Sequence, residues 1–195
     1  MPRLSIEVLD ETRRLPEAAL AWLIRHAERA VRRVGGQGEV RVRIVGDEAM
    51  AAAHEEFAGV AGTTDVLTFD MSEPVDDGPE AGDRGGEEDG ERSPPPLPTL
   101  DEIRQDNVRS SCVLDTDILV CIDEAERQST ARGYPCEREL LLYTLHGVLH
   151  CIGFDDHEEA DFEAMHGAED AVLAAIGVGP VFHRPYVAGD GPGEA

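Results

Sequence analysis

The segment from Glu137 to His150 constrains the fold more than any other part of the chain. The run that leads into the first histidine has strong helix formers and no helix breaker, so it predicts a helix that continues to His150. Most of its side chains are apolar, which puts the helix in or beside a buried core. His146 and His150 are four residues apart and therefore project from one face of the helix. Gly153 is expected to end it, because glycine tolerates the left-handed turn that follows many helices.

The two histidines and the residues after this turn predict a metal site. Neutral imidazoles beside a buried face need hydrogen-bond partners or a metal ion. The turn would bring Asp155, Asp156 and His157 back toward the pair, and a catalytic zinc ion takes three protein ligands and a water. We therefore expect one Zn²⁺ at His146 and His150, which would act in catalysis through the metal-bound water. The alternative interpretation is a pair of partly buried or surface histidines without a metal.

One position in this helix argues against a peptidase. Metalloproteases of the zincin class carry His-Glu-x-x-His, in which the glutamate directly after the first histidine is the general base. Here that position is Gly147, which has no side chain. The helix is therefore zincin-like in its histidine spacing, but the sequence disfavours a zincin-type peptidase.

The rest of the chain alternates between strand and helix patterns. Strict alternation of apolar and polar residues predicts strands, and apolar stripes with helical spacing predict helices. The segment 117–123 is continuous in apolar residues and is expected to be a central strand buried on both faces. Asp47 is the predicted N-cap of its helix. In the helix over 158–176, the side chains expected to face inward are Phe162, Met165, Ala168, Val172 and Leu173.

The predicted elements define a fold class. Strands are expected at 4–8, 39–45, 63–70 and 117–123, and helices at 16–34, 47–57, 124–132, 137–150 and 158–176. This order predicts an α+β fold, with a single mixed β-sheet of about four strands, helices packed on it and a zincin-like metal helix.

Length and charge indicate one domain with an acidic insertion. The 195 residues and a hydrophobic content of 41% suit a single core. The net charge is −24, and part of it lies in a Pro- and Gly-rich stretch at about 72–112, which predicts a disordered insertion. We expect one domain over 1–186 and a loose tail over 187–195. The sequence shows no signal peptide, disulfide framework or bilayer-spanning run, which predicts a cytoplasmic protein with no membrane partner.

Three motifs resemble those of the YbeY family of bacterial rRNA maturation factors. Residues 146–157 read His-Gly-Val-Leu-His-Cys-Ile-Gly-Phe-Asp-Asp-His, similar to the family's His-Gly-x-Leu-His-x-x-Gly-Tyr-Asp-His. Residues 64–69, Thr-Asp-Val-Leu-Thr-Phe, resemble its Thr-Asp-Val-Leu-Ser-Phe. Residues 117–125, Asp-Ile-Leu-Val-Cys-Ile-Asp-Glu-Ala, are similar to its Gly-Asp-Ile-x-Ile-x-x-Asp-x-Ala segment. The resemblance covers residues 6–176 except for 72–112.

This resemblance implies a zinc-dependent, single-strand-specific endoribonuclease whose zinc is held by three histidines. It implies a role in ribosomal RNA processing (16S rRNA 3′-end maturation) and ribosome quality control, with ribosomal RNA and the small ribosomal subunit as partners. Two other functions stay open: a metallohydrolase of another substrate, which the acidic composition favours, and a zinc-containing ribosome-biogenesis binding protein with little catalysis. The acidic insertion either binds a basic ribosomal protein or is a solvated loop.

Two departures from the family pattern affect the expected site. The family's third histidine falls at Asp156, and His157 comes one position later. We expect His157 as the third metal ligand, with Asp156 as the alternative, since zinc also accepts oxygen. The family also often carries an arginine, thought to contact the RNA phosphate, where this chain has Ala58.

Five further residues are candidates for binding substrate or orienting the ligands. Arg41 and Arg43 belong to a group of six arginines between residues 25 and 43, which either suits phosphate or forms a solvated surface. His54 lies one turn before the missing arginine, where family members often have asparagine. Thr64 and Asp65 are expected either to orient a ligand histidine or to make hydrogen bonds at a strand end.

Overall fold

The computed structural model describes residues 4–72, 113–156 and 159–182. Within these ranges the strands and helices follow the predicted order, which confirms the α+β fold. The elements are β1 (Ser5–Asp10), α1 (Glu17–Arg33), β2 (Gln37–Val45), α2 (Asp47–Ala58), β3 (Val66–Asp70), β4 (Val113–Cys121), α4 (Ile122–Arg132), α5 (Cys136–Cys151) and α6 (Glu159–Ala175).

The four strands form one mixed sheet in the order β1-β2-β4-β3. β1, β2 and β4 are parallel, whereas β3 is antiparallel to β4. Successive side chains of a strand point to opposite faces, and the inner strands put their apolar set on the face that the helices cover. These fully buried side chains are Val40, Val42, Ile44, Leu114, Ile118 and Val120.

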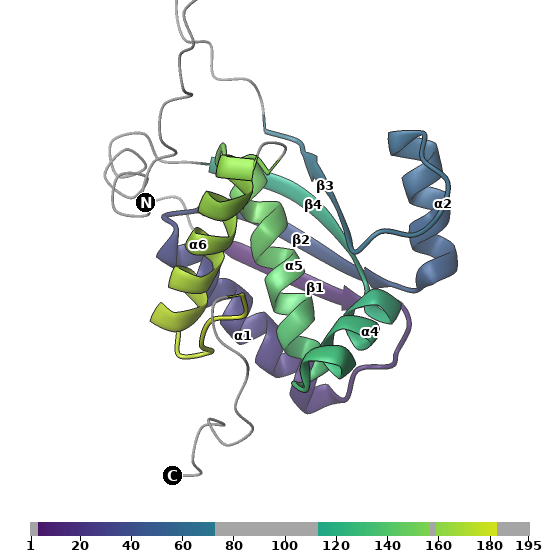
Figure 1. Cartoon of the computed structure of the whole chain (residues 1–195), viewed down its shortest axis with the longest axis horizontal. Helices are drawn as coiled ribbons and strands as arrows, with labels where there is room; N and C mark the ends of the chain where they lie inside the picture. The colour runs from purple at the N-terminus through teal and green to yellow at the C-terminus, as the bar shows by residue number, and fades with distance from the viewer. Residues whose placement is uncertain (1–3, 73–112, 157–158, 183–195) are drawn as a thin grey trace, which may run out of the picture.

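Four helices pack on this face and build the main core with it. Figure 1 shows α5 running across the sheet, with α1, α4 and α6 around it. Leu23 of α1, Leu141 and Leu149 of α5, and Leu173 of α6 all contribute side chains with 0% exposure to one cluster. α5 is therefore buried along nearly its whole length, as its apolar composition predicts.

The second face of the sheet is covered only in part. α2 packs over the end of β4 with a small separate core around Met50. Nearer the start of β4, this face carries Asp115 and Asp117, whose side chains are 50% and 41% exposed. The prediction that segment 117–123 is central is confirmed, because β4 is an inner strand. Its burial on both faces holds only toward the end of β4, where Cys121 is buried and Leu119 half-buried, and fails at Asp117.

Some element ends differ from the predicted ones. β3 begins at Val66, and Asp123 lies in the first turn of α4 rather than at the end of a strand. The N-cap of α2 is Gly46, so the prediction that Asp47 is the N-cap is wrong. The Asp47 carboxylate instead forms an ion pair with Arg127, 2.8 Å away. The side chain that local sequence predicted to cap the helix is therefore used in a long-range ion pair.

Several predictions concern residues outside the described ranges. They are the acidic insertion at about 72–112 (apart from residue 72), the ligand His157 and the tail over 187–195. These stay predictions, as does the extent of the single domain over 1–186. Of the helices in the ranges that the structure describes, none is long and apolar enough to cross a membrane.

Gly147 allows α5 to lie close to the sheet. A Cβ atom at this position would come within 2.5 Å of Thr68 Oγ1 and 3.2 Å of Ile118 Cδ1. We expect Gly147→Ala to lower the free energy of unfolding by about 1–3 kcal/mol, the usual cost of overpacking. Urea denaturation measures the change. The control is Gly167→Ala in α6, where an added Cβ meets nothing within 4 Å and should stabilise by up to about 1 kcal/mol. Equal stabilities of the two variants would contradict the close contact.

Candidate metal centre

Two histidines lie one turn apart on α5, at the edge of the buried core. The side chains of His146 and His150 are 19% and 31% exposed, while their neighbours Val148 and Leu149 are fully buried. Their Nε2 atoms are 3.0 Å apart, and the two rings meet edge to face. The two nitrogens therefore approach the same point, as the spacing of four residues predicts.

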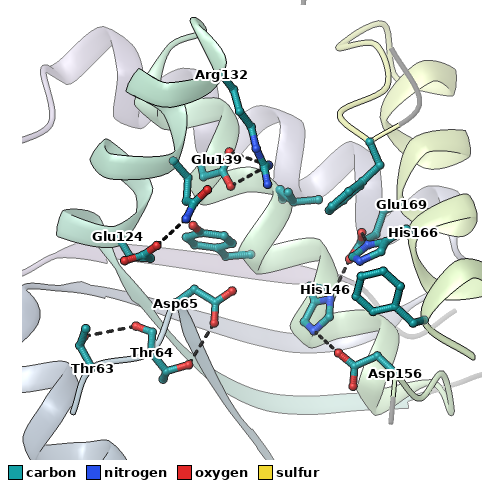
Figure 2. Close-up of a pocket in the computed structure, with 15 residues that line it drawn as sticks. Thr63, Thr64, Asp65, Glu124, Arg132, Glu139, His146, Asp156, His166 and Glu169 are labelled. Atoms are coloured by element: carbon teal, nitrogen blue, oxygen red, sulfur yellow. Dashed lines mark hydrogen bonds and ion pairs between the residues drawn. The ribbon is translucent and has the colours of Figure 1, made fainter. Parts of the chain in front are cut away.

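A carboxylate completes the group after the end of α5. Gly153 has a φ of +98°, and the chain turns there as predicted. Asp156 then lies with Oδ2 3.5 Å from His146 Nε2 (Figure 2). Its Oδ1 lies 3.8 Å from His150 Nε2. The ligand atoms of these three residues all lie within 4.8 Å of one another, so they form a candidate metal-binding group. The structure thus places the alternative ligand, Asp156, at the histidine pair.

Each of these histidines is held through its other ring nitrogen. His146 Nδ1 lies 2.7 Å from Glu169 Oε1, and His150 Nδ1 lies 3.1 Å from the backbone carbonyl oxygen of Phe154. A carboxylate and a carbonyl accept hydrogen bonds, so each Nδ1 donates and each Nε2 keeps its lone pair for a metal. Metal-ligating histidines in proteins are usually held in this way. The donor set therefore fits a divalent cation.

Glu169 is a site residue that the sequence analysis missed. It comes from α6, its side chain is 1% exposed, and its second carboxylate oxygen lies 2.6 Å from His166 Nδ1. Burial alone would lower the pKa of His146, but the hydrogen bond and negative charge of Glu169, with smaller contributions from Asp156 and Asp65, hold that pKa above its usual value. Glu169 therefore both orients the ligand histidine and supplies negative charge near the cation site.

The sequence does contain a signal for Glu169. It follows Ala168 on the apolar stripe of the predicted helix 158–176, and an acidic residue at a buried position needs a partner. The same stripe includes Phe162, which was expected to face the core. Its side chain is instead 49% exposed and lines a cavity. That prediction is wrong because the first turns of α6 border the cavity and not the sheet.

A cavity of about 610 Å³ lies beside His146 and Asp156. Thr64 and Asp65 line it from the loop before β3 (Figure 2). Thr64 Oγ1 donates a hydrogen bond to Asp65 Oδ1, which also accepts one from the backbone N–H of Val66. Both residues thus make the strand-end hydrogen bonds that were one of their two predicted roles. Within the described ranges, neither hydrogen-bonds a ligand histidine.

The other candidate residues lie away from this cavity. Arg41 and Arg43 are on the sheet face opposite α5, where Arg41 pairs with acidic side chains of β2 and β4 and Arg43 pairs with Glu11. They alternate with the buried valines of β2, so the pleat points them away from the histidines. His54 is half-buried on α2, and its Nδ1 lies 2.9 Å from the Gly62 carbonyl oxygen. The structure therefore does not bring these three residues to the histidine pair.

The close contact at Gly147 explains why this helix lacks the peptidase glutamate. A Cβ atom there would already meet Thr68 Oγ1 at 2.5 Å. A glutamate would need the side chains of Thr68 and Ile118 to shift, or α5 to move away from the sheet. The metal group therefore has no general base directly after its first histidine, and the packing of the fold accounts for this.

Glu169→Gln tests the orienting role of the buried carboxylate. The amide keeps the shape of the side chain but removes its charge, and we expect metal affinity to fall by about 10–100-fold, as for other partners of metal-ligating histidines. Competition with a chromophoric chelator measures the affinity. The matched control is Glu163→Gln, the same change at an exposed position of α6. Equal affinities of the two variants would show that Glu169 does not support the ligand.

The fold and the site together define a class of protein. A helix with a histidine pair, one nearby carboxylate and an adjoining cavity, placed on an α+β sheet, is an arrangement suited to metal-dependent hydrolysis. Comparison with known proteins identifies the family within this class. The sequence model described as Endoribonuclease YbeY matches residues 5–177. The chain belongs to the YbeY endoribonuclease family, and it is a hydrolase that cleaves RNA internally.

Two sequence relatives agree with this assignment, and one solved structure is similar to the chain. An Endoribonuclease YbeY of Nocardioides sp. is 31% identical over 177 residues, covering 88% of this chain and 97% of the relative. One of Brevibacillus brevis is 30% identical over 176 residues, covering 90% and 98%. The solution structure of TM1509 from Thermotoga maritima is similar with a TM-score of 0.47 at 22% sequence identity, covering 88% of this chain and 91% of that one.

Proposed function

We propose that the protein is a zinc-dependent, single-strand-specific endoribonuclease that acts in ribosomal RNA processing, at the 3′ end of 16S rRNA, and in ribosome quality control. The proposed partners are ribosomal RNA and the small ribosomal subunit in the cytoplasm. The observation that carries the proposal is the approach of His146 Nε2, His150 Nε2 and the Asp156 carboxylate to one point beside the cavity. Membership of an endoribonuclease family supports RNA as the substrate.

The residues at this point fit zinc. Two imidazole nitrogens and a carboxylate are all donors that zinc accepts, and three protein ligands are the number found in catalytic zinc sites. Bound there, zinc would supply Lewis acidity and lower the pKa of a water molecule toward about 7. We propose His146, His150 and Asp156 as the ligands, because the structure brings these three together. This replaces the expectation of three histidines.

The surrounding residues prepare the ligands for this role. Glu169 keeps the proton of His146 on Nδ1, and the Phe154 carbonyl does the same for His150. Both Nε2 atoms are then fixed toward the cation, and neither ring has to reorganise when it binds. The cavity beside them is lined by Thr64 and Asp65, so the substrate would enter between the loop before β3 and α6.

Cleavage of defined RNAs tests the proposal. Zinc-loaded protein should cleave a single-stranded oligoribonucleotide and leave the same sequence intact when it is paired in a duplex. A chelator should stop the reaction, and added zinc should restore it. Small subunits that carry unprocessed 16S rRNA should then be cut at the 3′ end. Cleavage of the duplex at the same rate would contradict single-strand specificity.

The same assay separates the enzyme from a binding protein with a structural zinc. A structural site usually has four protein ligands and no open position. Zinc-loaded protein that binds small subunits but leaves single-stranded RNA intact would favour that second function. Binding of a basic ribosomal protein by the acidic insertion stays a separate prediction, which removal of residues 73–112 would test.

A further inference from the structure

We propose that Arg132 and Phe162 form a nucleotide subsite in the cavity beside the metal centre. In this subsite Arg132 binds a phosphate of the single-stranded RNA, and Phe162 stacks on a base. The inference rests on the proposed function, because it takes single-stranded RNA as the substrate. It starts from two features of the cavity, namely its single arginine and its exposed aromatic ring.

The charge of the cavity is unfavourable for RNA without an added cation. Among the 15 residues that line it, all in the described ranges, five are acidic: Asp65, Glu124, Glu139, Asp156 and Glu169. One is arginine, Arg132, and none is lysine. Each nucleotide of RNA brings a negative phosphate, which proteins commonly bind with arginine or lysine. Arg132 is therefore the permanent cation that these lining residues offer to a phosphate.

Buried groups hold Arg132 in position at the end of α4. Its Nη1 lies 3.1 Å from the Tyr134 hydroxyl and 3.2 Å from Glu139 Oε1. Glu139 is 1% exposed on α5, and Figure 2 shows its pairing with Arg132. It also accepts a hydrogen bond from Tyr134, which closes the group. The guanidinium carbon also lies 5.5 Å from the centre of the Phe182 ring. A side chain fixed in this way loses less entropy when it binds a ligand.

These contacts leave one edge of the guanidinium available. The group has five N–H donors on three nitrogens, and the hydrogen bonds that Arg132 makes within the described ranges all use Nη1. Nε and Nη2 form a planar edge that can bond two oxygens of one phosphate. The side chain is 36% exposed and lines the cavity. Glu139 thus occupies one nitrogen, and the edge formed by the other two suits a phosphate.

Phe162 supplies an aromatic surface in the same cavity. Its side chain is 49% exposed, and its ring meets the edge of His166 with centroids 4.1 Å apart. His166 stacks on Phe182 and hydrogen-bonds Glu169, which holds the ligand His146. Exposed aromatic rings stack on bases in proteins that bind single-stranded nucleic acids, with little regard to sequence. Phe162 therefore offers a base a stacking surface close to the metal centre.

The experiment must separate phosphate binding from the pairing of Arg132 with Glu139. The double variant Arg132→Gln/Glu139→Gln removes the ion pair without leaving a buried charge. The matched control, Arg14→Gln/Glu126→Gln, removes an exposed ion pair with the same change in net charge. Fluorescence anisotropy of zinc-loaded protein with a short single-stranded oligodeoxynucleotide measures binding, because this probe keeps the phosphates and bases and is not a ribonuclease substrate.

We expect the Arg132/Glu139 double variant to bind about tenfold or more weakly than wild type, because a charge-assisted contact is lost. The slope of log affinity against log salt should fall by about 0.7 for one phosphate contact on a single strand. Glu139→Gln alone keeps the arginine and should bind more tightly than the double variant, whereas the Arg14/Glu126 control should bind like wild type. If the double variant fails to fold, Arg132→Lys keeps the charge beside Glu139 but lacks the planar edge, and its binding should also weaken. Unchanged affinity and salt slope would overturn the phosphate role.

Phe162→Ala tests the stacking surface separately. We expect KM for single-stranded RNA to rise about tenfold with little change in kcat, and Phe162→Tyr to restore it. Phe57→Ala, at an aromatic residue of α2 that is 62% exposed, is the control. An unchanged KM in Phe162→Ala would overturn the subsite. If the wild-type protein did not cleave single-stranded RNA, the proposed function would be rejected. The anisotropy measurement would still show whether Arg132 binds phosphate.

Discussion

His150→Ala is expected to remove both the bound metal and RNA cleavage. The change deletes one of the two imidazoles whose Nε2 atoms lie 3.0 Å apart. Loss of the hydrogen-bond partner of a ligand lowers metal affinity by about 10–100-fold. Loss of the ligand itself should lower the affinity by more. Elemental analysis of the purified protein measures the metal content, and cleavage of a single-stranded oligoribonucleotide measures activity.

A matched control shows whether this effect is specific. His26 is a half-buried histidine of α1 that stacks on Trp22 and hydrogen-bonds the backbone carbonyl of the same residue. His26→Ala removes an imidazole that is not part of the candidate metal-binding group and should keep full metal content and activity. If His150→Ala also kept one metal ion per chain, the assignment of His150 as a ligand would be wrong.

Asp156→Ala is expected to have the second-largest effect, again exceeding about 100-fold in metal affinity. The carboxylate oxygens lie 3.5 and 3.8 Å from the two Nε2 atoms, so a cation between them would lose its third ligand. His157→Ala is the natural comparison, and we expect it to bind metal like wild type. Asp156→His should bind zinc, because imidazole is also a zinc ligand. If His157→Ala lost metal affinity and Asp156→Ala kept it, His157 would be the third ligand instead.

Local sequence was enough to predict most of the fold. The alternation in β2 and the apolar run into His150 give strong signals, because side-chain burial in these elements follows the 2.0 and 3.6 periods. β4 shows where this fails. Its apolar run suggested burial on both faces, but the extent of α2 over the second face depends on tertiary packing. The prediction that Asp47 is an N-cap was wrong for a similar reason, because its partner Arg127 is 80 residues away in the sequence.

The candidate site also contains residues that local sequence predicts and residues that depend on tertiary packing. His146 and His150 could be predicted because their relation lies within one helix. Glu169 could not be assigned as the partner of His146, because this contact depends on how α6 packs against α5. Arg41 points away from the site although its charge suits phosphate. The packing of the whole core decides which face of the sheet the helices cover, and local sequence does not show this. Charge alone therefore did not indicate which arginine lies near the site; among the residues that line the cavity, all in the described ranges, the arginine is Arg132.

The candidate ligands come from two separate parts of the chain, and this has a consequence for local stability. His146 and His150 belong to the deeply buried α5, whereas Asp156 lies in the connection that leads to α6. A cation that binds all three would fasten the C-terminal helix to the body of the protein, and its binding energy would add to the cost of opening that helix. Amide protons of α6 would then exchange with solvent more slowly in the loaded protein, while those in the middle of α5 would change little.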